Sequence, residues 1–289
     1  MEQIKKGLHA TEHFTPSELW DHIDRKPDAK VIEAAYGGLL SEAQPDQWNS
    51  GKGNARVDFA GACALARNGW PEGLAKIAPT LARVDELIAH TLPENIMAWD
   101  VAGETPDVGA YLSGVPECMI TTEEADGAAR MIRITVNYTA SGAVDTETIQ
   151  ARGVIACALI DALEHAGYRV EVSVALEVTA RNTGRRYSMR STFKRAEEPL
   201  NLDRLVFALI HPAMLRRVGV RCIELQADQE AAEAFIRNNY GSPEPITGEK
   251  GDIIIGELYG TGWTPERMAD EVIKYLSEVG VHMIDGAKV

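Results

Sequence analysis

Two stretches of alternating apolar and polar residues lie on either side of a long amphipathic segment in the middle of the chain. Residues 132–136 alternate Ile or Val with Arg or Thr, which is typical of a strand with one buried face. Apolar residues then recur at helical spacing from about residue 146, and Gly167 ends the segment. Residues 168–178 alternate again. The order strand, helix, strand predicts a parallel βαβ unit.

The pattern after this unit predicts a single layered domain. The turn Arg181-Asn182-Thr183-Gly184 joins two alternating stretches, which predicts an antiparallel hairpin from about 170 to 194. Hydrophobic periodicity further predicts a helix at 201–217, a short strand at 220–225, a helix at 228–239, a strand at 252–256, a helix at 264–279 and a final strand at 281–284. We therefore expect an α/β fold over residues 126–289, with a wound, mostly parallel sheet and one antiparallel hairpin.

Residues 1–125 predict a mainly helical, irregular N-terminal region. Pro, Gly and polar residues interrupt residues 1–56 at many positions, which favours short helices joined by irregular chain. Residues 57–92 contain two apolar-periodic segments. Gly69 suits the left-handed position after the first helix, and we expect Trp70 to pack at the corner between the two.

Residues 97–120 contain many Gly and Pro residues, with Trp99 and Tyr111 between them. Such a stretch favours an ordered but irregular crossing between modules, and we expect the two aromatic residues to hold it in place. Acidic residues in this stretch either form turns and caps or line a site; they are Asp100, Glu104, Asp107 and Glu117.

Two segments resemble uncharacterised proteins of tailed bacteriophages and related mobile elements. They are NGWPEG at 68–73 and DVAGETPDVGAYLSGVPECM at 100–119. The resemblance implies a phage-encoded protein and carries no known activity. Separately, the order of elements after residue 126 resembles a von Willebrand factor A-type domain, in which a hairpin follows the first helix. This second resemblance concerns the fold only.

The resemblance to A-type domains implies a metal site after the first strand. In that family a D-x-S-x-S elbow, a threonine and a later aspartate hold the ion; here the matching positions are Asn137, Thr139, Ser141 and, after a late strand, Glu257. A neutral Asn attracts a cation such as Mg²⁺ less than a carboxylate does, although Asp145 lies close by. The elbow is therefore either a divalent-cation site, the only cofactor site that the chain indicates, or a degenerate corner kept for structure. If the strand at 220–225 is the central one, Asp228 replaces Glu257 as the late ligand.

Residues 181–195 are strongly basic and contain no acidic residue. Their basic residues are Arg181, Arg185, Arg186, Arg190, Lys194 and Arg195. Alternate residues of a strand share a face, so Arg186, Arg190 and Lys194 are expected to form one cationic stripe. The stripe can bind nucleic acid or an acidic partner, or it can pair with acidic residues of the same chain.

Charge and motifs narrow the function further. Twenty-nine basic and 43 acidic residues give a net charge of −14, which repels nucleic acid and anionic membranes from the molecule as a whole. No apolar run long enough for a membrane span, no secretory signal and no CxxC pair occur. We therefore expect a cytoplasmic protein with reduced cysteines, in the host cytoplasm if a phage encodes it.

The sequence contains none of the common nucleotide-binding, zinc-protease or nucleophile-elbow motifs. We therefore expect a non-catalytic interaction or scaffold protein that binds a protein partner, or a second copy of itself, through the elbow face or the basic hairpin. Two alternatives stay open. One is a nucleic-acid-associated phage protein that binds through residues 181–195, and the other is a metal-dependent hydrolase centred on the elbow.

Overall fold

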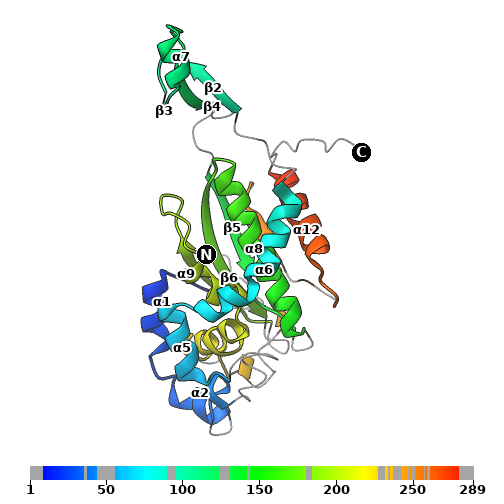
Figure 1. The fold of residues 1–289 in the computed structure, drawn as a ribbon. Coiled ribbons are helices and arrows are strands. Elements are labelled where there is room, and N and C mark those ends of the chain that lie inside the picture. Colours follow the sequence, from blue (N-terminus) through cyan, green and yellow to red (C-terminus); the bar gives the residue numbers. More distant parts are fainter. Residues whose placement is uncertain are drawn as a thin grey trace.

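The computed structural model describes most of the 289 residues. The described residues are 9–35, 38–43, 56–89, 96–103, 105–123, 131–141, 144–179, 184–226, 232–233, 235–236, 242–246, 248, 251–256, 258 and 261–279. Figure 1 shows a main body of helices over a sheet, and a small separate unit. Among the described residues, no helix has both the length and the apolar character needed to cross a membrane.

The main sheet has the strand order β1-β7-β6-β5-β9, and a short strand β8 pairs with β6. These strands are β1 (His9–Phe14), β5 (Met131–Asn137), β6 (Arg169–Thr179), β7 (Arg186–Lys194), β8 (Ser242–Pro243) and β9 (Ile253–Ile255). β5 runs parallel to β6 and β9, β1 runs parallel to β7, and β6 and β7 are antiparallel. The expectation of an α/β fold with a mostly parallel sheet, an antiparallel hairpin and a helical N-terminal region is confirmed.

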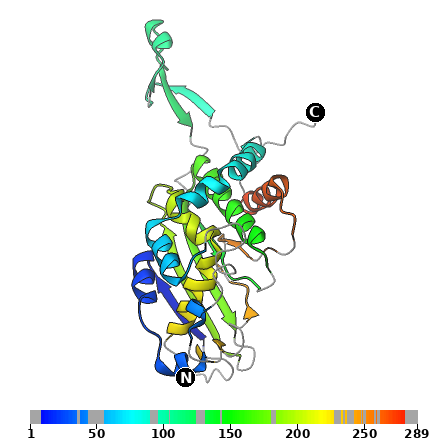
Figure 2. The ribbon, with the colours of Figure 1, turned by 60° about the horizontal axis from the view of Figure 1, so that its bottom comes forward.

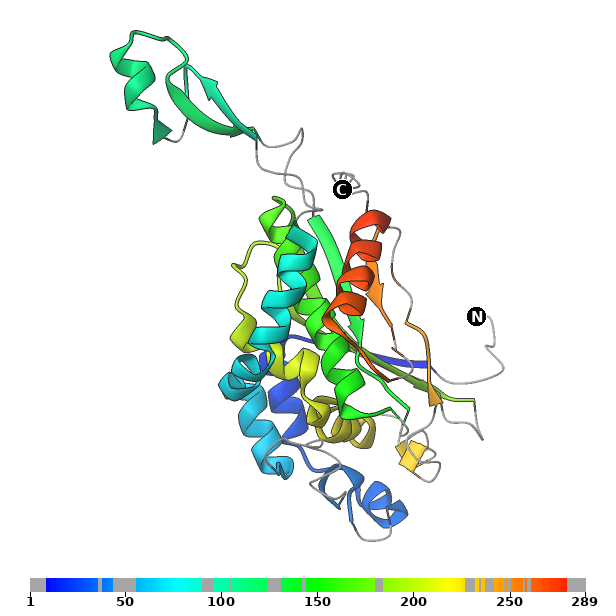
Figure 3. The ribbon, with the colours of Figure 1, turned by 45° about the vertical axis from the view of Figure 1, so that its right-hand side comes forward.

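The helices of the main body pack over one face of this sheet or on one another. They are α1 (Pro16–Ile23), α2 (Ala29–Ala34), α3 (Leu40–Ala43), α5 (Phe59–Asn68), α6 (Pro71–Ala89), α8 (Thr146–His165), α9 (Leu202–Ile210), the π-helix η1 (Met214–Gly219), α10 (Val220–Leu225) and α12 (Pro265–Glu278). α8 contacts β6, and α6 and α12 pack on α8; Figure 3 shows α6 (cyan) and α8 (green) together on one side of the sheet.

The two faces of the sheet differ in chemistry because side chains alternate along each strand. The face under the helices is apolar and includes the buried residues Ile134, Val174 and Met189. The opposite face carries Thr135, Ser173, Glu177, Arg186, Ser188, Arg190 and Thr192 in matching register. We call this second face the polar face.

The main hydrophobic core joins the beginning of the chain to its end, and a smaller cluster of Val31, Ala35, Ala232 and Ile236 lies apart from it. Leu19 of α1, Ile77 of α6 and Val272 of α12 belong to the same buried cluster as Ile134 of β5. β1 also pairs along its length with β7. The predicted boundary near residue 125 therefore does not separate two independent cores.

Local sequence signals explain where several helices begin and end. Thr15 and Glu18 form a capping box at the start of α1, and Asp145 caps α8. Gly167 follows α8 with a φ of 82°, a left-handed conformation that glycine adopts without steric cost. Gly69 has a φ of 84° at the end of α5, where the buried Trp70 then begins the corner to α6. The roles of Gly167, Gly69 and Trp70 were expected from the sequence.

Two predicted elements are wrong in the region after β7. The short strand expected at 220–225 is the helix α10, and the apolar run there was too short for its periodicity to separate a strand from a buried helix. The single helix expected at 201–217 ends at Ile210, because Pro212 interrupts it before η1 begins. The predicted strand at 281–284 and most of the predicted helix at 228–239 lie outside the described residues.

The second unit is a three-stranded antiparallel sheet of order β2-β4-β3, with one short helix. Its elements are β2 (Ile96–Asp100), β3 (Thr105–Pro106), α7 (Val108–Leu112) and β4 (Met119–Glu123). We call this unit the arm, and Figures 1 and 2 both show it standing away from the main body. The irregular crossing expected here, held by buried aromatic residues, is therefore wrong: the unit has regular strands, and Trp99 and Tyr111 are exposed.

Candidate functional site

The elbow after β5 is built from buried polar groups that bind one another. The Asn137 Oδ1 atom accepts hydrogen bonds from the Thr139 backbone N–H at 3.1 Å and from the Thr139 Oγ1 hydroxyl at 2.6 Å. The Asn137 Nδ2 atom donates to the Glu244 carbonyl at 2.9 Å. Ser141 is exposed, and the Asp145 carboxylate accepts from the Thr148 N–H at 2.7 Å as the cap of α8.

A buried guanidinium group fills the inner side of the elbow. Arg152 of α8 donates through Nη1 to the carbonyls of Asn137 and Thr139 at 2.7 and 3.0 Å, and through Nη2 to the Tyr138 carbonyl at 3.2 Å. Arg216 of η1 donates to the Val144 carbonyl at 3.1 Å, and burial lowers the pKa of Arg216 to about 10. Two cationic side chains thus stabilise the loop from inside.

These described residues do not fit the divalent cation that the resemblance to A-type domains implies. The side-chain oxygens of Asn137 and Thr139 bind each other, and the Arg152 guanidinium would repel a second cation beside it. Within the described ranges, no group of three His, Cys, Asp or Glu side chains is placed to hold a metal. Glu257 and Asp228 lie outside the described residues, so their role as late ligands stays a prediction.

A small cavity adjoins the elbow. It has a volume of about 10 Å³ and is lined by Ala140, Val144, Thr148, Ile149, Arg152 and Leu258. This volume is close to the minimum that holds one water molecule. This cavity therefore has room for about one water molecule.

The basic stretch is divided between the two faces of the sheet. Arg186 is exposed and Arg190 is half-buried, and both belong to the polar face of β7. Arg185, just before the strand, is half-buried, and Arg195, just after it, is exposed. Arg181 lies outside the described residues.

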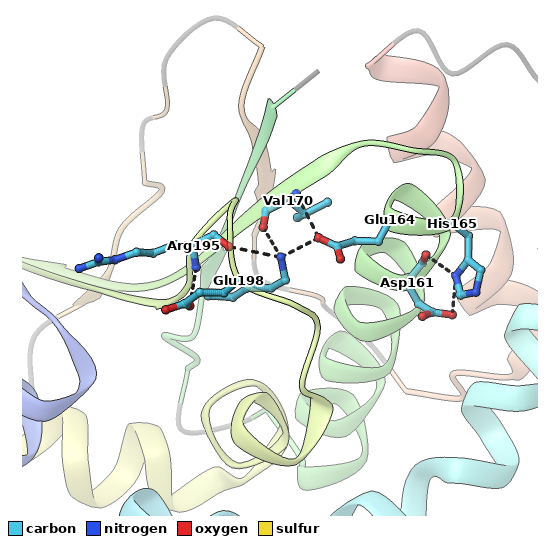
Figure 4. Close-up of polar contacts among 7 residues, drawn as sticks. Asp161, Glu164, His165, Val170, Arg195 and Glu198 are labelled. Atoms are coloured by element: carbon cyan, nitrogen blue, oxygen red, sulfur yellow. Dashed lines mark hydrogen bonds and ion pairs between the residues drawn. The ribbon is translucent and has the colours of Figure 1, made fainter. Parts of the chain in front are cut away.

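Lys194 is not part of the expected stripe. The register of β6 and β7 shifts between Val172 and Ser173, so that Lys194 pairs with Val172 on the face under the helices. Its Nζ atom lies 2.6 Å from the Glu164 carboxylate and donates to the Val170 carbonyl at 2.8 Å. Figure 4 shows Glu164 of α8 and Val170 of β6 meeting at this point. Lys194 therefore ties β7 to α8.

Two further groups near α8 and α9 have shifted pKa values. Burial, together with the nearby Asp161 carboxylate, raises the pKa of Asp85 to about 6, and His165 acts in the opposite direction; Figure 4 shows the Asp161–His165 pair. Burial and then the charge of Lys76 lower the pKa of His211 to about 4. Both groups lie in contacts between helices, so they bear on stability.

A second buried ionic cluster was not anticipated from the sequence. Arg217 donates to the carbonyls of Val57 and Ser41 at 2.9 and 2.7 Å. Glu224 accepts from the Ser41 hydroxyl at 2.6 Å, and burial raises the pKa of Glu224. Arg221 pairs with Glu42. The signal was the helical spacing of 217, 221 and 224, which the interpretation of 220–225 as a strand concealed.

The arm carries most of the large apolar side chains that the described residues expose. Of seven such residues six belong to the arm, namely Trp99, Val101, Val108, Tyr111, Leu112 and Val115. Leu112 is 78% exposed and Tyr111 is 67% exposed. A cluster of exposed apolar residues on one small unit is typical of an interaction site.

The arm is nevertheless internally ordered by hydrogen bonds. The Asp107 carboxylate caps α7 by accepting from the Ala110 N–H at 3.0 Å, and its other oxygen accepts from the Trp99 indole at 3.1 Å. These bonds lower the pKa of Asp107. Asp107 thus has the capping role that the sequence left open, and it presents Trp99 and α7 as one surface.

Comparison with known proteins identifies a family and no activity. The model of the family described as "Domain of unknown function (DUF7192)" matches residues 12–282. No curated protein and no solved structure matches the chain.

Proposed function

The chain belongs to this family of unknown function, and we propose that it is a non-catalytic interaction protein whose docking element is the arm. The proposal rests on one observation: large apolar side chains that soluble proteins normally bury are concentrated on the arm and exposed there. Covering such residues stabilises a complex by roughly 25 cal/mol per Å² of apolar surface before the costs of association.

The geometry of the elbow supports the same assignment. A catalytic site needs a polar group that can reach a substrate. Here Asn137, Thr139 and Arg152 bind groups of their own chain, and the adjoining cavity is about 10 Å³. Among the surfaces in the described part of the chain, the arm is therefore the best supported for function.

Photo-crosslinking from the arm tests this function. We replace Tyr111 with a benzophenone amino acid in the full chain, and we replace the exposed His165 of α8 in a control variant. The expected result is a covalent protein adduct from position 111 and little from position 165. Leu112→Ser in the same chain should reduce the adduct by about tenfold, because one buried Leu contributes about 1.5–3 kcal/mol. Equal yields at both positions would overturn the proposal.

A further inference from the structure

The arm is acidic as well as apolar. Residues 96–123 contain five acidic residues and no Lys, Arg or His; the acids are Asp100, Glu104, Asp107, Glu117 and Glu123. Asp100 and Glu117 are exposed, as are Tyr111 and Leu112. The surface that a partner must match therefore combines carboxylates with aromatic and aliphatic side chains.

The polar face of β7 has the complementary chemistry. Residues 181–195 contain six basic residues and no acid, and Arg186 and Arg190 stand on the polar face. The exposed His13 of β1 lies beside Arg190 in register, and Glu177 of β6 lies beside Ser188 as the acidic neighbour on this face.

The guanidinium groups on β7 can bind both kinds of side chain that the arm exposes. A guanidinium group binds carboxylates through paired hydrogen bonds and stacks on aromatic rings. Between the two arginines the polar face carries only the small Ser188 on β7, beside Ala175 and Glu177 of β6. Ala175 is buried and Ser188 is half-buried, so Tyr111 or Leu112 of an incoming arm would lie along the exposed Arg186 side chain.

We propose that the arm of one copy binds the polar face of β7 in a second copy, so that two chains form a reciprocal dimer. This proposal rests on the proposed function and names its partner. A net charge of −14 means that most of a second copy repels an acidic arm, whereas the basic stretch attracts it. Reciprocal exchange uses each arm once and closes with twofold symmetry.

Sedimentation velocity of the purified full chain tests the dimer. At 50 mM salt we expect a concentration-dependent shift from monomer to dimer at micromolar concentrations. Raising the salt to 300 mM should weaken association by about tenfold, because exposed charge pairs are screened. Leu112→Ser should weaken it by a further factor of roughly 10. A wild-type chain that stays monomeric to 100 µM at 50 mM salt would overturn the proposal.

A charge exchange separates this geometry from other modes of self-association. One variant carries Arg186→Glu and Arg190→Glu, and the other carries Asp100→Lys and Glu117→Lys. Each variant alone should be monomeric, because positions 100 and 117 of its arm and positions 186 and 190 of its β7 face then have charges of the same sign. In an equimolar mixture both contacts join opposite charges, so a heterodimer should return. Dimers of either variant alone, or no heterodimer in the mixture, would contradict the reciprocal contact.

Two controls test whether a change in net charge or a loss of folding explains the result. Glu33→Lys with Glu72→Lys changes two exposed acids of α2 and α6 and should leave the dimer intact. Far-UV circular dichroism should show the same fold in every variant. If the wild type is monomeric and Tyr111 still crosslinks to a different protein, the second-copy partner is excluded and the docking role of the arm is retained. If the wild type is monomeric and position 111 crosslinks to no protein, both proposals fail.

Discussion

Replacing Arg152 with Met should destabilise the whole domain by removing the cation at the elbow. Arg152 is 3% exposed and donates to the carbonyls of Asn137, Tyr138 and Thr139. A hydrogen bond to a charged group contributes about 1.5–3 kcal/mol, and a buried carbonyl left without its donor costs about 1–3 kcal/mol. Relief of the burial cost of the charge offsets part of this loss. We expect the free energy of unfolding to fall by about 3–5 kcal/mol, a large part of the typical 5–15 kcal/mol.

Urea denaturation followed by far-UV circular dichroism measures this change. With a slope of about 3 kcal/mol per molar urea, the midpoint should fall by roughly 1–1.7 M. Arg204→Met is the matched control, because Arg204 is exposed on α9; its midpoint should change by less than about 0.2 M.

Small losses in the Arg152 variant would refute the reasoning about the elbow. If Arg152→Met costs less than about 1 kcal/mol, the three carbonyls do not depend on the guanidinium. A variant that unfolds with a much lower urea slope would instead show that the native state has loosened.

Three further changes test other contacts of the fold. Gly153→Ala should cost more than about 2 kcal/mol despite the helix preference of Ala, because the new Cβ would lie 2.1 Å from Ile210 Cγ1; differential scanning calorimetry measures it. The pKa of His211 falls from 6.5 to about 4 on folding, so the wild type should lose stability as the pH falls from about 6.5 to 4. The loss should be about 3 kcal/mol larger than in the His211→Gln variant. Urea titrations at several pH values measure it. Lys194→Met should cost about 2–4 kcal/mol, because it leaves Glu164 half-buried and without its cation, as chemical denaturation would show.

Each of these changes has a control at an exposed or open position. A Cβ at Gly256 meets no atom within 4 Å, so Gly256→Ala should be nearly neutral. His165 is exposed, and His165→Gln should not alter the loss of stability between pH 6.5 and 4. Arg186→Met should change stability by less than about 0.5 kcal/mol. If a control variant loses as much stability as its test variant, the corresponding contact does not explain the loss.

The pH prediction for His211 also has a structural basis in its hydrogen bond. The Nδ1 atom accepts from the Ala213 N–H at 3.0 Å, while the ring lies against Trp70 and Phe207 with centroids 4.5 and 5.2 Å away. Protonation would turn this acceptor into a donor. The unfolded chain binds the proton at higher pH than the folded chain, so acid favours unfolding.

The sequence predicted elements whose hydrophobic period extends over many residues. The strand β5, the helix α8 and the strand β6 follow directly from alternation and helical spacing, and Gly167 ends the helix where expected. Short apolar runs were ambiguous. α10 has only six residues, and a run of that length fits either a strand or a buried helix.

The candidate site was harder to predict from the sequence because it depends on contacts between distant elements. Nothing local shows that Arg152 turns toward the carbonyls of residues 137–139, or that one extra residue in β7 moves Lys194 to the other face. Trp is highly buried on average and Tyr is intermediate, whereas the small sheet leaves both Trp99 and Tyr111 exposed. The sequence predicted a protein-interaction function, and the proposed surface comes from the fold.

Hydrogen exchange in the arm as a function of protein concentration tests the central claim most directly. We expect the backbone amides of residues 105–120 to become protected as the wild-type chain is raised from nanomolar to tens of micromolar concentration. Leu112→Ser should abolish this protection, whereas the amides of β7 are already paired with β1 and β6 and should not change. Exchange in the arm that is fast and independent of concentration would contradict the claim that a second copy covers it.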